Sequence, residues 1–168
     1  MAGDLGRRLV ESSELHGDFV LSSGKRSTVY FDKFRFLTDP ILLRETASAV
    51  RALLPKGLTH LASPEGAATL LLAAVALDEG LPMVMVRKER KEYGTGSQVE
   101  GTMPPGARVA LLEDVSTTGH QVAAAAKALE NEGGEIALIV LVIDRGGGDP
   151  LRGAGYSVES LVSLRPDD

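Results

Sequence analysis

Two adjacent acids followed by small hydroxylated residues form the strongest chemical pattern in this sequence. Glu113 and Asp114 follow a strand predicted over 108–112, and Ser116–Gly119 lead into a helix predicted to begin at His120. Backbone N–H groups in a tight loop and at a helix N-terminus bind anions. Acids beside such a loop accept hydrogen bonds from hydroxyls or bind Mg²⁺. A loop that binds both phosphate and vicinal hydroxyls is expected to bind a ribose 5-phosphate.

The alternative for this pattern is a ligand-free turn that Asp114 and Ser116 cap. We favour the phosphate site because a strand, the run Thr117–Gly119 and a helix follow one another in the required order. Other phosphate-binding motifs do not fit. The chain has no G-x-x-x-x-G-K-[ST] loop, and the glycines at 94 and 96 do not open a helix.

A second pattern is a cluster of cations after the apolar run 83–86. Its members are Arg87, Lys88, Arg90 and Lys91. They lie in or beside residues 89–106, a glycine-containing stretch without periodicity. A solvated charged turn is the alternative, but the position at a strand end in an acidic chain favours a clamp for a polyphosphate. The glycines would let this stretch close as a lid.

Two weaker patterns follow other predicted strands. Arg145, between Asp144 and three glycines, suits bidentate binding of a planar acid or imide, and a surface salt bridge is an equal alternative. The loop 63–67 is either an anion loop or a helix cap with Glu65 in the first turn, and the sequence leaves both open. The three histidines lack metal-ligand spacing, so we expect no zinc site. No G-x-S-x-G motif supports Ser/His/Asp catalysis.

Composition limits the class of protein. The 168 residues are 43% apolar and 24% charged, which is enough for one globular domain. A net charge of −5 argues against general binding of nucleic acid or anionic membranes, and the absence of cysteine excludes thiolate chemistry. The apolar runs 70–77 and 137–143 are too short to span a bilayer, and the start lacks a signal-peptide pattern. We therefore expect a cytoplasmic protein without a membrane or nucleic-acid partner.

The elements that must position these residues alternate in type. Residues 1–36 are mixed and charged, with a helix predicted over 5–15 and two short strands near 19–21 and 29–31. Asp39-Pro40 then begins a helix, with Asp39 as N-cap. The remaining predicted elements are a helix over 39–54, strand 58–62, helix 65–78, strands 83–86 and 108–112, helix 120–132 and strands 136–143 and 157–164. Continuous apolar strands alternating with helices predict a parallel sheet covered on both faces. Ligands bind such sheets beyond the carboxyl ends of the strands.

At this point the sequence resembles a known family. Leu111–Gly119 is similar to the ribose-phosphate loop of type I phosphoribosyltransferases. Residues 87–101 resemble the flexible loop of the orotate phosphoribosyltransferase family, with Tyr93 where that family usually has His. Residues 17–32 resemble its N-terminal signature, with Ser22 where some members have Lys. Together with Ile143–Arg145, these motifs run in family order from about residue 16 to 146.

The resemblance implies a type I phosphoribosyltransferase fold, with a central parallel sheet flanked by helices and a small N-terminal hood. Residues 1–168 would form one domain, with the hood at 1–36, the α/β core at 39–164 and the flexible catalytic lid at 89–106. Family members share this lid across a homodimer, and Mg²⁺ is the cofactor. The metal would be bound mainly through the substrate's pyrophosphate, with Glu113 and Asp114 as candidate protein ligands.

The resemblance also implies roles for individual residues. Phosphoribosyl pyrophosphate would be bound by Arg87, Lys88, Lys91, Tyr93, Glu113, Asp114, Val115, Ser116, Thr117, Thr118, Gly119, His120 and Gln121. Orotate would be bound by Thr117, Arg145, Tyr30, Phe31 and Lys25. The catalytic residues would be Lys91, Arg87 and Asp114. If Lys91 contacts the leaving pyrophosphate only in the transition state, its loss should lower kcat by roughly 10²–10³-fold.

The implied reaction is transfer of ribose 5-phosphate from phosphoribosyl pyrophosphate to N1 of orotate, which gives orotidine 5′-monophosphate and pyrophosphate. Two alternatives remain. One is a phosphoribosyltransferase for another base, against which the N-terminal signature and Arg145 argue. The other is a regulatory protein that senses phosphoribosyl pyrophosphate without catalysis. Such regulators carry an added DNA-binding domain, and no basic helix-turn-helix precedes the fold here.

Overall fold

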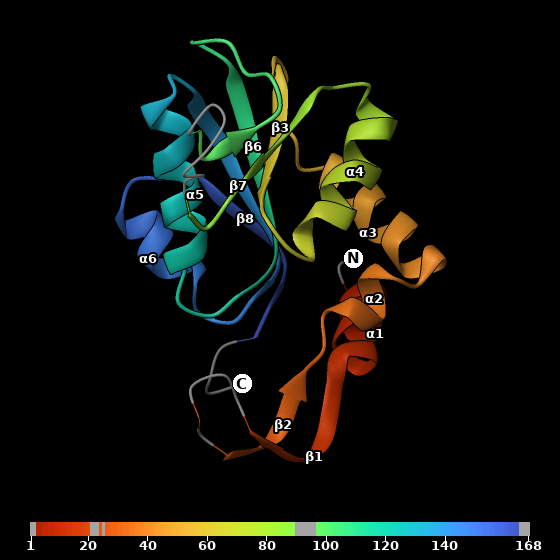
Figure 1. Ribbon diagram of the computed structural model, residues 1–168. Helices are drawn as coiled ribbons and strands as arrows, with labels where there is room; N and C mark the ends of the chain where they lie inside the picture. Colours follow the sequence, from red (N-terminus) through yellow and green to blue (C-terminus); the bar gives the residue numbers. More distant parts are fainter. Residues whose placement is uncertain (1–2, 21–23, 25, 90–96, 165–168) are drawn as a thin grey trace.

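The computed structural model describes residues 3–20, 24, 26–89 and 97–164. It contains a two-stranded antiparallel ribbon and a six-stranded sheet, in the strand order β5-β4-β3-β6-β7-β8 (Figure 1). In chain order the elements are α1 (Gly3–Ser13), β1 (Glu14–Val20), β2 (Arg26–Phe31), α2 (Phe34–Leu37), α3 (Pro40–Arg51), β3 (His60–Pro64), α4 (Ala68–Glu79), β4 (Met83–Val86), β5 (Val99–Glu100), β6 (Arg108–Ser116), α5 (His120–Asn131), β7 (Glu135–Asp144), α6 (Gly148–Gly153) and β8 (Val158–Ser163).

The sheet is buried on both faces, as the apolar strands predict. Strands β3, β4, β6, β7 and β8 pair in parallel, and among the described strands of this sheet only the short β5 pairs antiparallel, at an edge. Alternate residues of β6 enter two cores. Ala110 and Leu112 pack with α3 and α4, whereas Val109 and Leu111 pack with α5 and α6. Figure 1 shows these helix pairs on opposite sides of the sheet. The predicted α/β fold class is confirmed.

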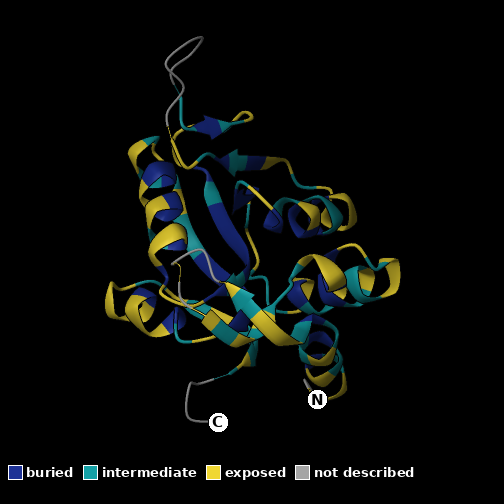
Figure 2. Cartoon of the chain, turned by 60° about the horizontal axis from the view of Figure 1, so that its bottom comes forward, coloured by how far each residue is buried: buried dark blue, intermediate teal, exposed yellow. Residues whose placement is uncertain are grey.

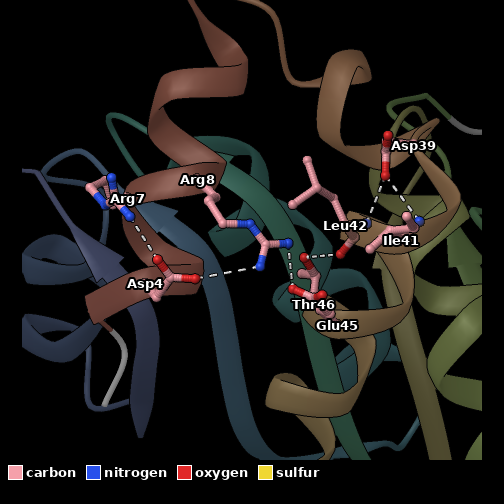
Figure 3. A network of polar contacts seen from close by, with 8 residues as sticks. All are labelled: Asp4, Arg7, Arg8, Asp39, Ile41, Leu42, Glu45 and Thr46. Atoms are coloured by element: carbon pink, nitrogen blue, oxygen red, sulfur yellow. Dashed lines mark hydrogen bonds and ion pairs between the residues drawn. The ribbon is translucent and has the colours of Figure 1, made fainter.

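The hood, residues 1–36, leaves one face of its ribbon in solvent. Exposed and half-buried residues alternate along β2, and Figure 2 shows the ribbon in yellow and teal beside the dark blue central strands. The hood is joined to the core by apolar side chains, because Leu9 and Phe36 are fully buried in the cluster around α3 and α4. An ion pair of 2.6 Å between Arg8 and Glu45 also joins α1 to α3 (Figure 3).

The predicted helix start at Asp39-Pro40 is confirmed. Asp39 Oδ1 accepts hydrogen bonds from the backbone N–H groups of Ile41 at 2.9 Å and Leu42 at 2.8 Å, and Pro40 is the first helical residue (Figure 3). This side chain therefore satisfies two of the N–H groups that a helix start leaves without partners. No helix in the described parts of the chain is long and apolar enough to cross a membrane.

Several predicted boundaries differ from the structure. The helix predicted over 39–54 ends at Arg51, and the one predicted over 65–78 begins at Ala68. Within the stretch 89–106, predicted as a loop, Val99–Glu100 forms β5. The sequence does not predict helix α6, because Gly146, Gly147, Gly148 and Pro150, in and before it, are typical of turns.

The difference that matters most concerns β6, which was predicted to end at Leu112. It continues to Ser116 because Val115 and Ser116 pair with Ile143 and Asp144 of β7. Acidic residues are uncommon in strands, so the sequence pattern places the strand end too early. The acid pair thus lies within a buried strand instead of beyond it.

Candidate active site

The acid pair of β6 is deeply buried. Glu113 is 4% exposed and Asp114 is fully buried. Asp114 Oδ1 accepts a hydrogen bond of 2.6 Å from its neighbour Val115 N. Asp114 Oδ2 is buried and has no hydrogen-bond partner among the described residues. A buried carboxylate oxygen without a partner is costly, and a ligand hydroxyl could satisfy it.

A lysine of the hood compensates part of this negative charge. Lys33 Nζ lies 3.1 Å from Asp114 Oδ1. The pKa of Glu113 is raised to about 8, first because burial penalises its charged form and then because Asp114 is negative beside it. The charge of Lys33 partly offsets this increase. Sequence analysis gave Lys33 no role, because the pair joins residues 81 apart in the chain. Its place directly after the Tyr30-Phe31-Asp32 signature is the one signal that could have identified it.

The predicted phosphate loop joins β6 to α5. Thr117, Thr118 and His120 are exposed, so their polar groups are open to a ligand at the N-terminus of α5. Gly119 has a left-handed backbone with φ of 74°, and a Cβ there would lie 2.6 Å from Gly147 O. Only glycine allows this conformation and this close approach. The loop thus packs against the turn after β7 through Gly119, while Thr117 and Thr118 stay exposed to a ligand, as an anion site requires.

The turn after β7 brings Arg145 to the same edge of the sheet. Arg145 N donates to Ser116 O at 2.8 Å, and the guanidinium lies 5.2 Å from the centre of the Phe31 ring. The buried Asp144 accepts from Gly146 N at 3.0 Å and Gly148 N at 2.9 Å, and these bonds hold the turn. The structure therefore brings together Arg145 and Phe31, two of the residues predicted to bind the base.

The glycines of this turn also contact the phosphate loop. A Cβ at Gly147 would overlap Ser116 Oγ and would lie 2.9 Å from Gly119 N.

The other predicted base-binding residues are only partly placed. Tyr30 is 42% exposed on the ribbon and packs against Phe19, with ring centres 5.5 Å apart. Lys25 lies outside the described residues.

The base of the predicted lid lies beside the phosphate loop. Arg87 and Gln98 exchange hydrogen bonds, from Arg87 N to Gln98 O at 2.9 Å and from Gln98 Nε2 to Arg87 O at 2.8 Å. These residues border a cavity of about 290 Å³, which is lined by Pro64, Val86, Arg87, Lys88, Gln98, His120, Gln121, Ala124 and Ala125. The predicted pyrophosphate residues Arg87 and Lys88 thus share a cavity with the first residues of α5. Lys91 and Tyr93 lie outside the described residues.

The structure corrects one of the two interpretations of loop 63–67. Glu65 does not cap α4, whose N-cap is Ala67 without a side-chain hydrogen bond. Its Oε1 instead accepts from Lys88 N at 2.8 Å, which ties this loop to the start of the cationic cluster. The helix-cap interpretation is therefore wrong, and the anion-loop interpretation stays a prediction.

The acid pair fits a shared metal better than a protein-only metal centre. Within the described residues, no group of three or more His, Asp or Glu side chains is placed to hold a metal ion. Asp114 Oδ2 is nevertheless a buried oxygen to which no described residue donates, and Glu113 lies beside it. Oxygen ligands of this kind suit Mg²⁺, which commonly takes one or two carboxylates plus substrate phosphates.

This geometry can be compared with known proteins. Residues 41–162 match the family profile of the phosphoribosyl transferase domain. The chain belongs to the phosphoribosyltransferase family. This phosphoribosyltransferase is 40% identical over 165 residues to the orotate phosphoribosyltransferase of Thermococcus gammatolerans, a match that covers 95% of this chain and 87% of that protein. It is 41% identical to that of Methanopyrus kandleri over 162 residues, again covering 95% of this chain and 87% of that protein.

Solved structures agree. The crystal structure of the Aeropyrum pernix orotate phosphoribosyltransferase is 33% identical, with a TM-score of 0.82, and the match covers 95% of this chain and 93% of that one. The Mycobacterium tuberculosis orotate phosphoribosyltransferase is 27% identical, with a TM-score of 0.84, covering 97% and 96%. The predicted resemblance to this family and its fold is confirmed.

Proposed function

We propose that this phosphoribosyltransferase transfers ribose 5-phosphate from phosphoribosyl pyrophosphate to N1 of orotate. The observation that carries the proposal is the meeting of three groups at the carboxyl end of the sheet. These are the buried acids of β6, the exposed hydroxylated loop at the start of α5 and the Arg145 guanidinium over Phe31. Relatives about 40% identical that carry the name orotate phosphoribosyltransferase support the choice of base.

The sugar phosphate would lie along β6 and α5. Asp114 and Glu113 would accept hydrogen bonds from the ribose hydroxyls, because both acids are buried near the end of β6 and Asp114 Oδ2 has no partner within the described residues. The 5-phosphate would be bound by the N–H and hydroxyl groups of residues 115–119, with His120 and Gln121 at the first turn of α5.

The pyrophosphate would be bound at the base of the lid. Arg87 and Lys88 line the cavity beside His120 and are the described part of the predicted clamp. The roles of Lys91 and Tyr93 remain predictions from the family resemblance. Magnesium would be bound mainly by pyrophosphate oxygens, with Glu113 or Asp114 as protein ligands, and would neutralise negative charge that develops on the leaving group.

The base would be held by the turn after β7 and by the hood. Arg145 presents a planar guanidinium that can bind the carboxylate of orotate with two parallel hydrogen bonds. Phe31 fixes the guanidinium from the hood side, and Thr117 is exposed near the same turn. Tyr30 and Lys25 complete the predicted base site.

The chemistry follows from these charges. The bond from ribose C1 to the pyrophosphate oxygen breaks, and its electron pair leaves with pyrophosphate. Orotate N1 then forms the new bond to C1, which is electron-poor at this stage, and the proton of N1 is lost to the departing pyrophosphate or to solvent. The buried Asp114 carboxylate beside the ribose stabilises this positive charge more strongly than it would in water. Closure of residues 89–106 would exclude water, which would otherwise hydrolyse the activated sugar.

The proposal includes a homodimer whose lid serves the neighbouring site, and a cytoplasmic location. Apolar side chains exposed on α3 and α4 support an interface, since Ile41 is 62% and Leu77 is 85% exposed. Light scattering after size exclusion should give twice the chain mass. Two inactive variants, one lacking Lys91 of the lid and one lacking Asp114, should then regain activity when mixed, because one hybrid site would be intact.

The decisive experiment is an ultraviolet assay of orotate consumption with phosphoribosyl pyrophosphate and Mg²⁺. Adenine, uracil and xanthine serve as control bases. We expect turnover of orotate alone, and loss of turnover without Mg²⁺. Turnover of another base in place of orotate would show that this phosphoribosyltransferase uses a different substrate. Binding of phosphoribosyl pyrophosphate without turnover of any base would favour the sensor alternative.

A further inference from the structure

The hood contacts the acid pair through Lys33, a residue outside the motifs that carry the family resemblance. Lys33 approaches Asp114 from the N-terminus of α2, at 3.1 Å. Its side chain is 38% exposed, whereas that of Asp114 is fully buried. The lysine therefore joins the site's solvent-facing side to a carboxylate that has no access to solvent.

The backbone around Lys33 is held firmly. Asp32 N donates to Ser13 O at 2.8 Å, and Phe34 N donates to Asp32 Oδ1 at 3.1 Å. Directly after it, Phe36 and Leu37 of α2 are 0% and 1% exposed in the core. The ammonium group is thus placed by the fold and is not merely the end of a flexible surface side chain.

The two oxygens of Asp114 are used unequally. Oδ1 accepts hydrogen bonds from both Lys33 Nζ and Val115 N. Oδ2 accepts none from the described residues and is buried. Two donors on one oxygen fix the rotation of the carboxylate and leave the other oxygen for a ligand hydroxyl. An unpaired charge buried at this position would be strongly unfavourable, so the lysine also compensates the charge.

We infer that Lys33 is a positioning residue for sugar recognition: it orients Asp114 so that Oδ2 can accept a ribose hydroxyl of phosphoribosyl pyrophosphate. This inference rests on the proposed function, because it assigns the ribose hydroxyls to Asp114. It makes sugar binding depend on correct seating of the hood, which is the part of the chain that also carries the predicted base-binding residues Tyr30 and Phe31.

The test compares binding of phosphoribosyl pyrophosphate by calorimetry, with Mg²⁺ and without orotate. Lys33→Met should raise the Kd about 10- to 100-fold, the range for one charge-assisted hydrogen bond. Lys33→Arg should restore most of the affinity, and the KM for orotate should stay within roughly twofold. Lys56→Met is the matched control. Lys56 is exposed before β3, at the amino ends of the parallel strands, whereas Asp114 lies towards their carboxyl ends.

A double-variant cycle separates positioning from direct substrate contact. If Lys33 acts through Asp114, Lys33→Met should have little further effect on the Kd when Asp114 is already Asn. Additive effects would overturn the inference, as would an unchanged Kd in Lys33→Met. The Asn background also removes the buried charge, so it tests the inference even if the single variant folds poorly. If the wild-type protein binds no phosphoribosyl pyrophosphate, the proposed function itself fails, and the inference fails with it.

Discussion

The two halves of the candidate site are held in place in different ways. The first half lies at the carboxyl ends of β6 and β7, two strands whose residues are almost all buried. The loops that follow these strands contact each other through the backbone of Gly119 and Gly147. The half on the hood stands on a ribbon with alternating exposed residues, and it reaches the first half through Lys33 and Phe31 (Figure 2).

This difference separates the determinants of stability from those of specificity. Changes in the core half should alter folding and sugar-phosphate binding together, because the same atoms serve both. Apart from changes at Lys33, which compensates the buried charge of Asp114, changes in the hood half should alter ligand binding with little loss of stability. Exposed contacts contribute small free energies, whereas tightly packed positions tolerate neither added nor removed volume.

The largest effect is expected at Gly147. An alanine there would overlap Ser116 Oγ, so the Gly147→Ala variant should lose about 3 kcal/mol of unfolding free energy, the upper end for overpacking. The same variant should bind phosphoribosyl pyrophosphate at least roughly tenfold more weakly, since displacement of Ser116 would weaken a proposed charge-assisted hydrogen bond to the 5-phosphate. Urea denaturation and calorimetry measure both. Gly153→Ala, where a Cβ meets nothing within 4 Å, is the control. A stable but non-binding Gly147→Ala would break the link between stability and binding.

The next effect concerns Glu113 and pH. Its pKa is raised to about 8 in the folded protein, so the folded state retains a proton that the unfolded state loses near pH 4.5. The unfolding free energy should therefore fall as pH rises from about 4.5 to 8, by at most ~1.4 kcal/mol per pH unit.

Glu113→Gln should flatten this slope, because glutamine does not titrate. Denaturation series between pH 5 and 9, without substrate or Mg²⁺, provide the measurement. Glu159→Gln, on an exposed position of β8, should leave the slope unchanged. A wild-type protein whose stability does not fall in this window would show that Glu113 is already ionised.

The smallest effect is expected in the hood. Phe31→Leu keeps an apolar side chain but removes the ring below the Arg145 guanidinium. The KM for orotate should rise roughly two- to fivefold, in line with ~0.5–1 kcal/mol for such a contact. The melting temperature and the Kd for phosphoribosyl pyrophosphate should change little. Phe34→Leu, at a 51% exposed position, is the control. An equal effect on both substrates would mean that the two halves are not separable.

The sequence predicts the core half well and the hood half poorly. Local sequence signals predict the phosphate loop at Thr117–Gly119 and the turn at Arg145. In both places an apolar strand, a turn and a helix start follow one another within a few residues. The end of β6 was missed because pairing with β7 overrides the low strand propensity of Glu113 and Asp114.

The remaining features depend on contacts across the chain. No spacing rule joins Lys33 to Asp114, and no composition signal distinguishes α6 from a glycine-rich turn. The family resemblance assigns Phe31 and Arg145 to one site, and the structure brings the two side chains together, but the resemblance does not supply their mutual packing. The roles of Lys25, Lys91 and Tyr93 remain predictions, because these residues lie outside the described parts of the chain.

The contact of Gly147 with Ser116 and Gly119 has a consequence for protein engineering. Transplanting the base-binding turn of a purine enzyme onto β7 would introduce side chains where the backbone of the neighbouring loop already lies. Both loops would have to be exchanged as one cassette. Redesign of base preference is more practical from Tyr30, which lies on the exposed face of the ribbon, where there is room for a new side chain.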